Sequence, residues 1–381
     1  MPQKSIQVCF VLIALTATFY FSGCHSVKSP DPFREQAEAH LARFVQQHPN
    51  IDAVSAAIVT PSGNLTLHAG SLLNGQPPHD ETLYEIASIT KTFTGLLLAH
   101  ALVEGRIDLD DDIREHLPAA YAASVPEGIT FRHLATHRSG LPLFFPHKEA
   151  LFASPPNWDT LPFEINRLQA GLTKAQFFAC LDEFELQVKP GESTLYSNAG
   201  TNLAGYLLES IYDQSFEQLL TNKLLEPLQM SHTTISLAKA DKRLLAKGYN
   251  ENRIKMPFRV EKQMNAEGGI ISNVEDMMQY LIYHLNSDAA VVQQAHASLL
   301  NEPSIPYHQG LFWHHKKGKD GQEILYQLGG AYGASSWICI LPALKKGVFL
   351  VTNTSGGAVH DQLEEVGWLM LGLERQEADG D

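Results

Sequence analysis

The sequence predicts a protein of the α/β class, α+β type, in which one antiparallel sheet is built from both ends of the chain and a helical lobe is inserted between its strands. Three observations predict this arrangement. Strand-like patterns occur near the start, within residues 54–69, and again near the end, within residues 323–352. Between them, residues 88 to about 290 carry mostly helical spacings of apolar side chains. We therefore expect a cleft where lobe and sheet meet, which is where small-molecule sites tend to form.

The first 24 residues have the pattern of an export signal. Lys4 precedes one apolar run, Val8 to Phe21, which is shorter than the roughly 20 residues of a membrane-spanning helix. The run ends in Phe21-Ser22-Gly23-Cys24, which resembles the lipobox of bacterial lipoproteins, although Phe21 stands where Leu is usual. We expect a lipid anchor on Cys24, facing the periplasm or the cell exterior, and an ordinary signal peptide is the alternative. His25 rather than Asp follows, which indicates the outer membrane in a Gram-negative cell.

The sheet-forming ends follow a polar tether at residues 25–31. Asp31-Pro32 is a helix start, and apolar residues continue at helical spacing to Gln47. Residues 54–60 and 65–69 predict a hairpin around the turn at 61–64. Near the other end, residues 323–327, 335–341 and 348–352 are strand candidates, followed by a helix at 359–373. The predicted domain covers 32–375, with its sheet region at about 32–87 and 305–375, and residues 376–381 form a tail.

The helical lobe is predicted at about 88–304. Its helices are expected at residues 93–103, 175–184, 200–212, 216–225 and 274–285. An insertion between the first two motifs described below holds Phe144, Phe145 and Trp158, which either line the substrate entrance or pack within the loop, and we favour packing.

Composition narrows the function classes. The chain of 381 residues is 44% hydrophobic and 18% charged, which is ordinary for a globular protein. Its formal net charge is −14. The negative electrostatic potential of such a chain repels phosphate backbones, so nucleic acid is not expected as a partner.

Cysteine and histidine provide little sign of a metal site. Only Cys180 and Cys339 lie in the body of the chain, where one disulfide is conceivable and two independent core thiols are favoured. His133 and His137 are four residues apart, a spacing that suits one helix face, but no third ligand accompanies them. Neither a metal nor an organic cofactor is expected.

Ser88 and Lys91 are the first candidate catalytic pair. They precede an amphipathic run, so Ser88 lies near a helix N-terminus and Lys91 lies one turn further on the same face. A neutral amine at that spacing is able to remove the serine proton. Ser236 and Lys239 have the same spacing, so only context separates the two pairs.

Two later segments supply that context. Tyr196 and Asn198 form the chain's one Tyr-x-Asn, in a loop that leads into the 200–212 helix. A phenol near an amine serves as acid or base, and Asn198 either orients the lysine and binds a substrate carbonyl or caps the helix. Residues 327–330, Gln-Leu-Gly-Gly, end a predicted strand, where glycines let a substrate approach backbone N–H groups.

Together these segments resemble the serine β-lactamase and penicillin-binding protein superfamily, in the group of class C β-lactamases, D-alanyl-D-alanine carboxypeptidases and related esterases. Ser88 and Lys91 match its S-x-x-K, Tyr196 and Asn198 its Y-x-N, and Gln327 to Gly329 its K-T-G or H-x-G. Residues 129–142, 226–230 and 268–272 are also similar to stretches common in the group. The resemblance spans about residues 33–373 and implies the β-lactamase-like fold.

The resemblance implies a role for each matched residue. Ser88 is the nucleophile, Lys91 and Tyr196 form the base system, and the N–H groups of Ser88 and Gly330 form the oxyanion hole. Which of Lys91 and Tyr196 takes the proton stays open, because coupled groups titrate as a pair. Asn198, Gln327 and Gly329 are expected to contact substrate. His133 and His137 become parts of a helix and turn near the cleft.

The expected activity is acyl transfer through Ser88 to amide or ester substrates: peptidoglycan peptides, β-lactams or small esters. Gln327 is the main departure from the family, because a neutral amide holds a substrate carboxylate less strongly than Lys or His. That difference favours a D-Ala-D-Ala peptidase or an esterase over a class C-like β-lactamase. A low-turnover cell-wall binding or regulatory protein is the alternative of another class.

Overall fold

The computed structural model describes residues 32–151, 157–236, 239–259, 266–300 and 308–374. Its main sheet has seven strands in the order β2-β1-β10-β9-β8-β7-β6, and every neighbouring pair is antiparallel. The strands are β1 (Ala53–Thr60), β2 (Gly63–Gly70), β6 (His308–Gln309), β7 (His314–Lys317), β8 (Glu323–Gly330), β9 (Ser335–Leu341) and β10 (Lys346–Thr352). The predicted mixed fold with an antiparallel sheet is confirmed.

The N-terminal hairpin pairs directly with the C-terminal strands, through β1 and β10. Val54 of β1 pairs with Thr352 of β10, and the register continues to Val59 opposite Gly347. Nearly all residues of β1 are buried, because both faces of the sheet are covered by helices. The two ends of the chain therefore complete one hydrophobic structure.

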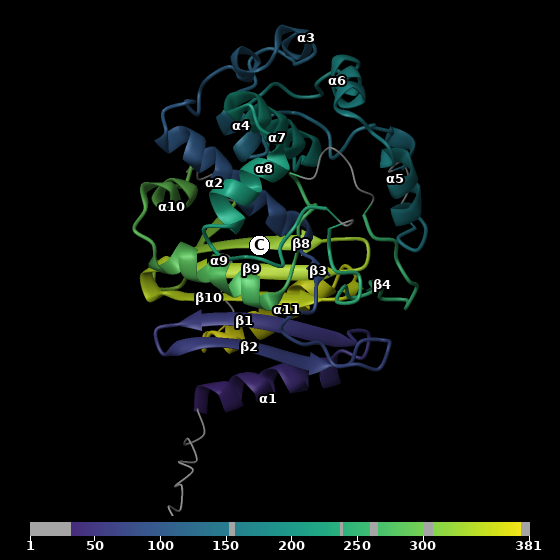
Figure 1. Cartoon of the computed structure of the whole chain (residues 1–381), viewed down its shortest axis with the longest axis vertical. Helices are drawn as coiled ribbons and strands as arrows, with labels where there is room; N and C mark the ends of the chain where they lie inside the picture. The colour runs from purple at the N-terminus through teal and green to yellow at the C-terminus, as the bar shows by residue number, and fades with distance from the viewer. Residues whose placement is uncertain (1–31, 152–156, 237–238, 260–265, 301–307, 375–381) are drawn as a thin grey trace, which may run out of the picture.

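Helices cover the two faces of the sheet. On one face lie α1 (Pro32–Gln47) and α11 (Val359–Met370), whose apolar sides share a core with Trp337 and Leu350. On the other face α9 (Val274–Asn286) packs against β1, β9 and β10. Figure 1 shows α1 beside the β1–β2 hairpin at one end of the stack of strands, and the helices of the lobe beyond β8 at the other end.

The lobe is organised around α2 (Thr90–Val103), which is buried along most of its length and contacts α7, α8 and α10. The other helices of the intervening region are α3 (Ala119–Ala122), α4 (Phe131–Ala135), α5 (Leu161–Gln169), α6 (Lys174–Asp182), α7 (Asn198–Tyr212), α8 (Phe216–Leu220) and α10 (Ala290–Ala295). Two short pairings, β3 (Tyr84–Glu85) with β5 (Ile271–Ser272) and β4 (Tyr249–Asn250) with β11 (Thr354–Ser355), connect lobe and sheet. The sequence analysis expected an amphipathic helix here, but α2 is buried on nearly all sides, and its buried residues include Lys91 and three threonines.

Several elements differ from expectation. The predicted helix at 216–225 is α8 followed by a π-helical turn at Thr221–Leu225. Helix α4 ends at Ala135, and His137 has a positive φ of 56°, so His133 and His137 do not share a helix face. Helices α5 and α10 and strands β6 and β7 were not predicted; α10, β6 and β7 are too short for a period to be recognised.

Cys180 and Cys339 are free thiols. The expected signal peptide, the tether and the tail at 376–381 lie outside the described residues. No helix in the described part of the chain is both long and apolar enough to cross a membrane.

Candidate active site

Ser88 lies in a tight 3-10 turn, Ala87–Ile89, between β3 and α2. Ala87 has a φ of +50°, a left-handed conformation that a residue with a Cβ rarely adopts. The flanking Ile86 holds the turn in place: its N–H donates to the Ile270 carbonyl at 3.1 Å, and its carbonyl accepts from Ser336 Oγ at 2.9 Å. Long-range contacts thus maintain the turn that carries Ser88.

Gly329 of β8 permits the sheet to approach this turn closely. A Cβ added there would overlap Ser336 Oγ and the Ile86 carbonyl. A Cβ on Gly330 would meet its nearest atom, His360 Cε1, at 3.4 Å, which is an ordinary contact. Gly329 is therefore required by packing, whereas Gly330 borders the cavity beside Ser88.

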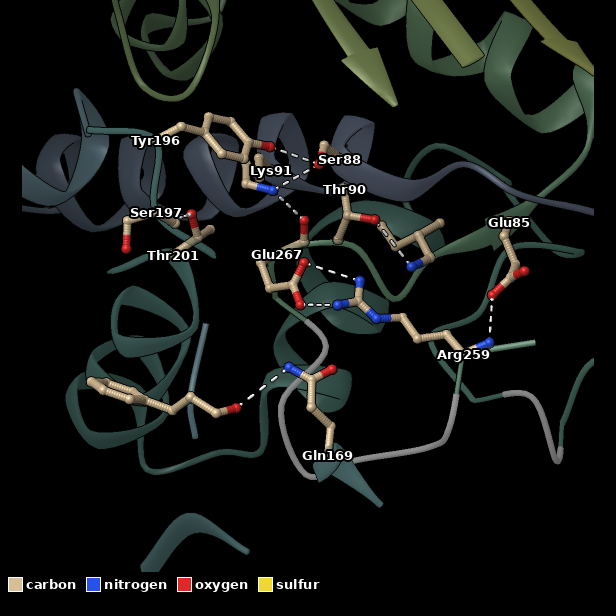
Figure 2. A network of polar contacts seen from close by, with 12 residues as sticks. Glu85, Ser88, Thr90, Lys91, Gln169, Tyr196, Ser197, Thr201, Arg259 and Glu267 are labelled. Atoms are coloured by element: carbon tan, nitrogen blue, oxygen red, sulfur yellow. Dashed lines mark hydrogen bonds and ion pairs between the residues drawn. The ribbon is translucent and has the colours of Figure 1, made fainter. Parts of the chain in front are cut away.

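Two of the predicted side chains converge on the hydroxyl of the third. Ser88 Oγ accepts hydrogen bonds from Lys91 Nζ at 2.9 Å and from the Tyr196 hydroxyl at 2.7 Å. Lys91 Nζ also donates to the carbonyl of Glu267 at 2.6 Å, as Figure 2 shows. The spacing of one helical turn thus brings amine and hydroxyl together as expected, and Tyr196 joins them from another segment.

The segment at 137–143 positions Tyr196. The Leu195 N–H donates to the His137 carbonyl at 2.7 Å, and the Ser197 N–H donates to His137 Nδ1 at 3.2 Å. Ser197 Oγ donates to the Pro142 carbonyl at 2.7 Å and caps α7 by accepting from the Gly200 N–H. The imidazole of His137 lies 4.5 Å from the Tyr196 ring between centroids.

Burial sets the protonation of the two groups that contact Ser88. Lys91 is fully buried, and this lowers its pKa to about 7, although the nearby Glu267 carboxylate opposes the change. Desolvation raises the pKa of Tyr196 above its usual value, with the Ser88 hydrogen bond opposing, while 39% of the residue stays exposed. Near neutral pH a large fraction of Lys91 is neutral and Tyr196 keeps its proton.

Ser88 opens onto a cavity of about 460 Å³. Gly330 and Asn198 line it, and among the described residues the buried Oδ1 of Asn198 has no hydrogen-bond partner. Trp158, which is 63% exposed, and the buried Phe144 form part of the apolar wall. Phe145 instead packs against Phe177 and Phe184. The favoured packing interpretation of the insertion therefore holds for Phe145 alone.

Arg259 and Glu267 belong to the site but were missed by the sequence analysis. The Arg259 guanidinium forms two hydrogen bonds with the Glu267 carboxylate, which is 2% exposed, and both residues line the cavity. The Arg259 backbone N–H donates to Glu85 at 2.9 Å. A signal existed for Glu267, which directly precedes the glycine pair at 268–269, but none singled out Arg259.

Gln327 does not occupy the expected substrate-facing place. It is 2% exposed, its Nε2 donates to the Phe312 carbonyl at 2.7 Å, and its Oε1 accepts from the Leu328 N–H at 2.9 Å. The Phe312 carbonyl and the Leu328 N–H occupy both ends of the amide, so the expected contact of Gln327 with substrate stays a prediction that this geometry does not favour. Gly329 was expected to contact substrate through its backbone; it packs against Ser336 and Ile86, whereas its neighbour Gly330 lines the cavity.

The remaining candidates have structural roles. His133 Nδ1 accepts from the Thr130 N–H in a capping box of α4, which agrees with the helix-and-turn interpretation. Lys239 pairs with Glu217 at 2.7 Å, and its side chain is far more exposed than that of Lys91. The 236–239 pattern therefore does not reproduce the environment of Ser88. Across the described residues, no group of three or more His, Cys, Asp and Glu side chains is arranged to hold a metal ion.

The fold and the convergence of Ser88, Lys91 and Tyr196 define the class of serine β-lactamases and penicillin-binding proteins. The chain belongs to the Beta-lactamase family, whose model matches residues 41–368. It is 28% identical over 298 residues to Protein flp of Staphylococcus aureus strain MW2, covering 75% of this chain and 55% of that protein. It is 27% identical over 255 residues to a Beta-lactamase of Providencia stuartii, covering 66% of this chain and 60% of that protein. The matched region thus spans little more than half the length of these relatives.

Proposed function

We propose that the protein is a serine hydrolase that forms an acyl-enzyme on Ser88 with ester or amide substrates. The observation that carries the proposal is the pair of hydrogen bonds from Lys91 and Tyr196 to Ser88 Oγ, at 2.9 and 2.7 Å. A nucleophile within hydrogen-bond reach of a base and an acid is the arrangement that acyl transfer requires.

The proposed chemistry assigns one task to each group. Neutral Lys91 accepts the Ser88 proton as Oγ attacks the substrate carbonyl. The N–H groups of Ser88 and Gly330 stabilise the oxyanion, a contribution of about 10²–10³-fold per donor. Tyr196 donates its proton to the leaving group and regains one from Lys91, and water then releases the acyl group by the reverse proton path. The assignment of Lys91 as the base follows from the pKa near 7 of its buried amine.

Among substrates we favour esters and amides without a carboxylate next to the scissile bond. The cation that lines the described cavity, Arg259, is paired with Glu267, and Gln327 is held by backbone groups. Asp159 and Glu251 add negative charge to the lining. A carboxylate-bearing D-Ala-D-Ala peptide would therefore bind less well than a neutral ester. β-Lactam hydrolysis is the second candidate, supported by the relative named Beta-lactamase.

Intact-mass measurement tests the proposal. The protein is incubated separately with p-nitrophenyl esters, D-Ala-D-Ala peptides and a set of β-lactams, and product release is followed in parallel. We expect rapid ester turnover, with an acyl adduct that the Ser88→Ala variant does not form. Ser236→Ala is the matched control and should behave as wild type. Stoichiometric adduct formation in Ser88→Ala would exclude Ser88 as the nucleophile, and a stable adduct without product would favour the low-turnover binding protein.

We also propose that the protein is exported and anchored to the membrane by a lipid on Cys24. The proposal is supported by the apolar run and the four-residue lipobox-like sequence that ends at this cysteine. Cys24→Ala should move the protein from the membrane fraction to the soluble fraction. Unchanged sedimentation with membranes would contradict the lipid anchor.

A further inference from the structure

Glu267 connects Lys91 to a buried ion pair. Its carbonyl accepts a hydrogen bond from Lys91 Nζ at 2.6 Å, while its carboxylate is bound by the guanidinium of Arg259. Figure 2 shows Arg259 between Glu267 on one side and Glu85 on the other. One residue therefore gives Lys91 both a hydrogen-bond acceptor and a neighbouring charge.

Among the described residues, the cations near the buried carboxylate of Glu267 are Arg259 and Lys91. A buried carboxylate needs a counter-ion, since an unpaired one is strongly unfavourable. Arginine remains charged at all relevant pH values and binds a carboxylate through two parallel hydrogen bonds, whereas a buried lysine readily loses its proton. The geometry matches this division, because Arg259 meets both carboxylate oxygens and Lys91 meets the backbone carbonyl.

We propose that the Arg259–Glu267 ion pair is a positioning device: Arg259 serves as the counter-ion of Glu267, so that Lys91 stays neutral and directed at Ser88. The inference rests on the proposed function of Lys91 as the base. It assigns roles to two residues that contact neither Ser88 Oγ nor its proton.

The two charges of the pair act on Lys91 in opposite directions. Burial is the largest cause of the lowered pKa of Lys91; the Glu267 carboxylate opposes it by raising the pKa, and the Arg259 guanidinium lowers the pKa further. Removing Arg259 would leave the Glu267 carboxylate to attract a proton onto Lys91. Removing the Glu267 carboxylate would leave Arg259 to repel that proton. A purely structural pair would give no such opposite responses.

Other titratable groups surround Lys91 and the ion pair. Burial lowers the pKa of His137 well below its usual value and that of His314 to about 4, so both imidazoles are neutral near pH 7. Burial raises the pKa of Tyr196, so its hydroxyl keeps its proton near pH 7. Glu85, behind Arg259, has its pKa raised by burial, which Arg259 opposes, and it faces Arg259 rather than Lys91.

The test is an NMR titration of Lys91 in the full chain, using ¹³Cε-labelled lysine with the signal assigned by its loss in Lys91→Met. We expect the midpoint to move upward in Arg259→Gln and downward in Glu267→Gln, by roughly 1–3 pH units each. The double variant Arg259→Gln/Glu267→Gln should return toward wild type. Glu364→Gln, which breaks the Lys316–Glu364 pair elsewhere, is the matched control and should leave the midpoint unchanged.

Arg259→Lys keeps the positive charge but lacks the planar guanidinium, so the Lys91 midpoint in this variant should stay closer to wild type than in Arg259→Gln. This second variant keeps the test valid if Arg259→Gln folds poorly. The acidic limb of the pH dependence of kcat/KM should follow the same order. Midpoints that are unchanged, or that move in one direction in both single variants, would overturn the proposal. Because the titration needs no turnover, failure to acylate Ser88 would refute the proposed function separately.

Discussion

Replacing Lys91 with methionine should stabilise the folded protein at neutral pH while abolishing acylation. Methionine is similar in length and carries no charge, so it fills the buried site without desolvating an amine. The buried Lys91 has a pKa lowered from 10.5 to about 7. Between these pH values the unfolded chain binds a proton that the folded protein does not, so the free energy of unfolding of the wild type rises with pH.

The magnitude follows from that interval. Each pH unit corresponds to about 1.4 kcal/mol, so the cost of burying Lys91 at pH 7 is at most about 5 kcal/mol. It is largest at and below pH 7 and disappears as the pH passes 10.5. Lys91→Met also loses the hydrogen bonds to Ser88 and Glu267, at about 0.5–1.5 kcal/mol each. We therefore expect a net gain of about 2–4 kcal/mol at pH 7.

Urea unfolding at several pH values from 7 to 10 measures this difference. The advantage of Lys91→Met over wild type should shrink by about 1.4 kcal/mol for each pH unit above 7. Lys239→Met is the matched control: its side chain is 65% exposed, so no pH-dependent difference is expected. A Lys91→Met protein that is less stable at pH 7, or a difference that does not change with pH, would refute the reasoning.

Three further predictions concern the strand and loop beside Ser88. Gly329→Ala should lower the free energy of unfolding by about 1–3 kcal/mol, because the added Cβ overlaps the turn that carries Ser88. Gly330→Ala should change the free energy of unfolding by less than about 0.5 kcal/mol. Thermal unfolding compares the two variants, and equal losses of stability would contradict the packing argument. Gln327→Lys should destabilise the protein by about 3 kcal/mol or more, because the new charge is buried among backbone groups. It should not speed acylation by benzylpenicillin. A several-fold faster acylation rate in stopped-flow measurements would show that this position faces the substrate. Tyr196→Phe should slow acylation by about 10²–10⁴-fold, and a loss of under threefold would mean that the leaving group obtains its proton elsewhere.

Much of the fold was predictable because it depends on local periodicity. The N-terminal helix, the hairpin and the terminal helix were expected within a few residues of α1, β1–β2 and α11. Elements shorter than about two helical turns, such as α4 and α10, carry too few apolar positions for a period to be recognised. The sequence analysis ended this strand at Gln327. Strand β8 extends to Gly330, because its pairing with β9 continues through glycines, which have no strand preference of their own.

Within the site, the sequence by itself predicted the Ser88–Lys91 pair, because a spacing of three residues at a helix start places two side chains on the same face, and the later motifs separated this pair from Ser236 and Lys239. Only the tertiary structure decided what meets that pair. Tyr196 arrives from 108 residues away and the Glu267 carbonyl from 176 residues beyond Lys91. The alternation of side chains along β8 places Gln327 and Gly329 on the same face of the sheet. It does not reveal that the Gln327 amide donates a hydrogen bond to the Phe312 carbonyl. Local spacing fixes which side chains share a turn or a face, whereas burial, ion pairing and pKa depend on distant segments that reach the same place only when the chain folds.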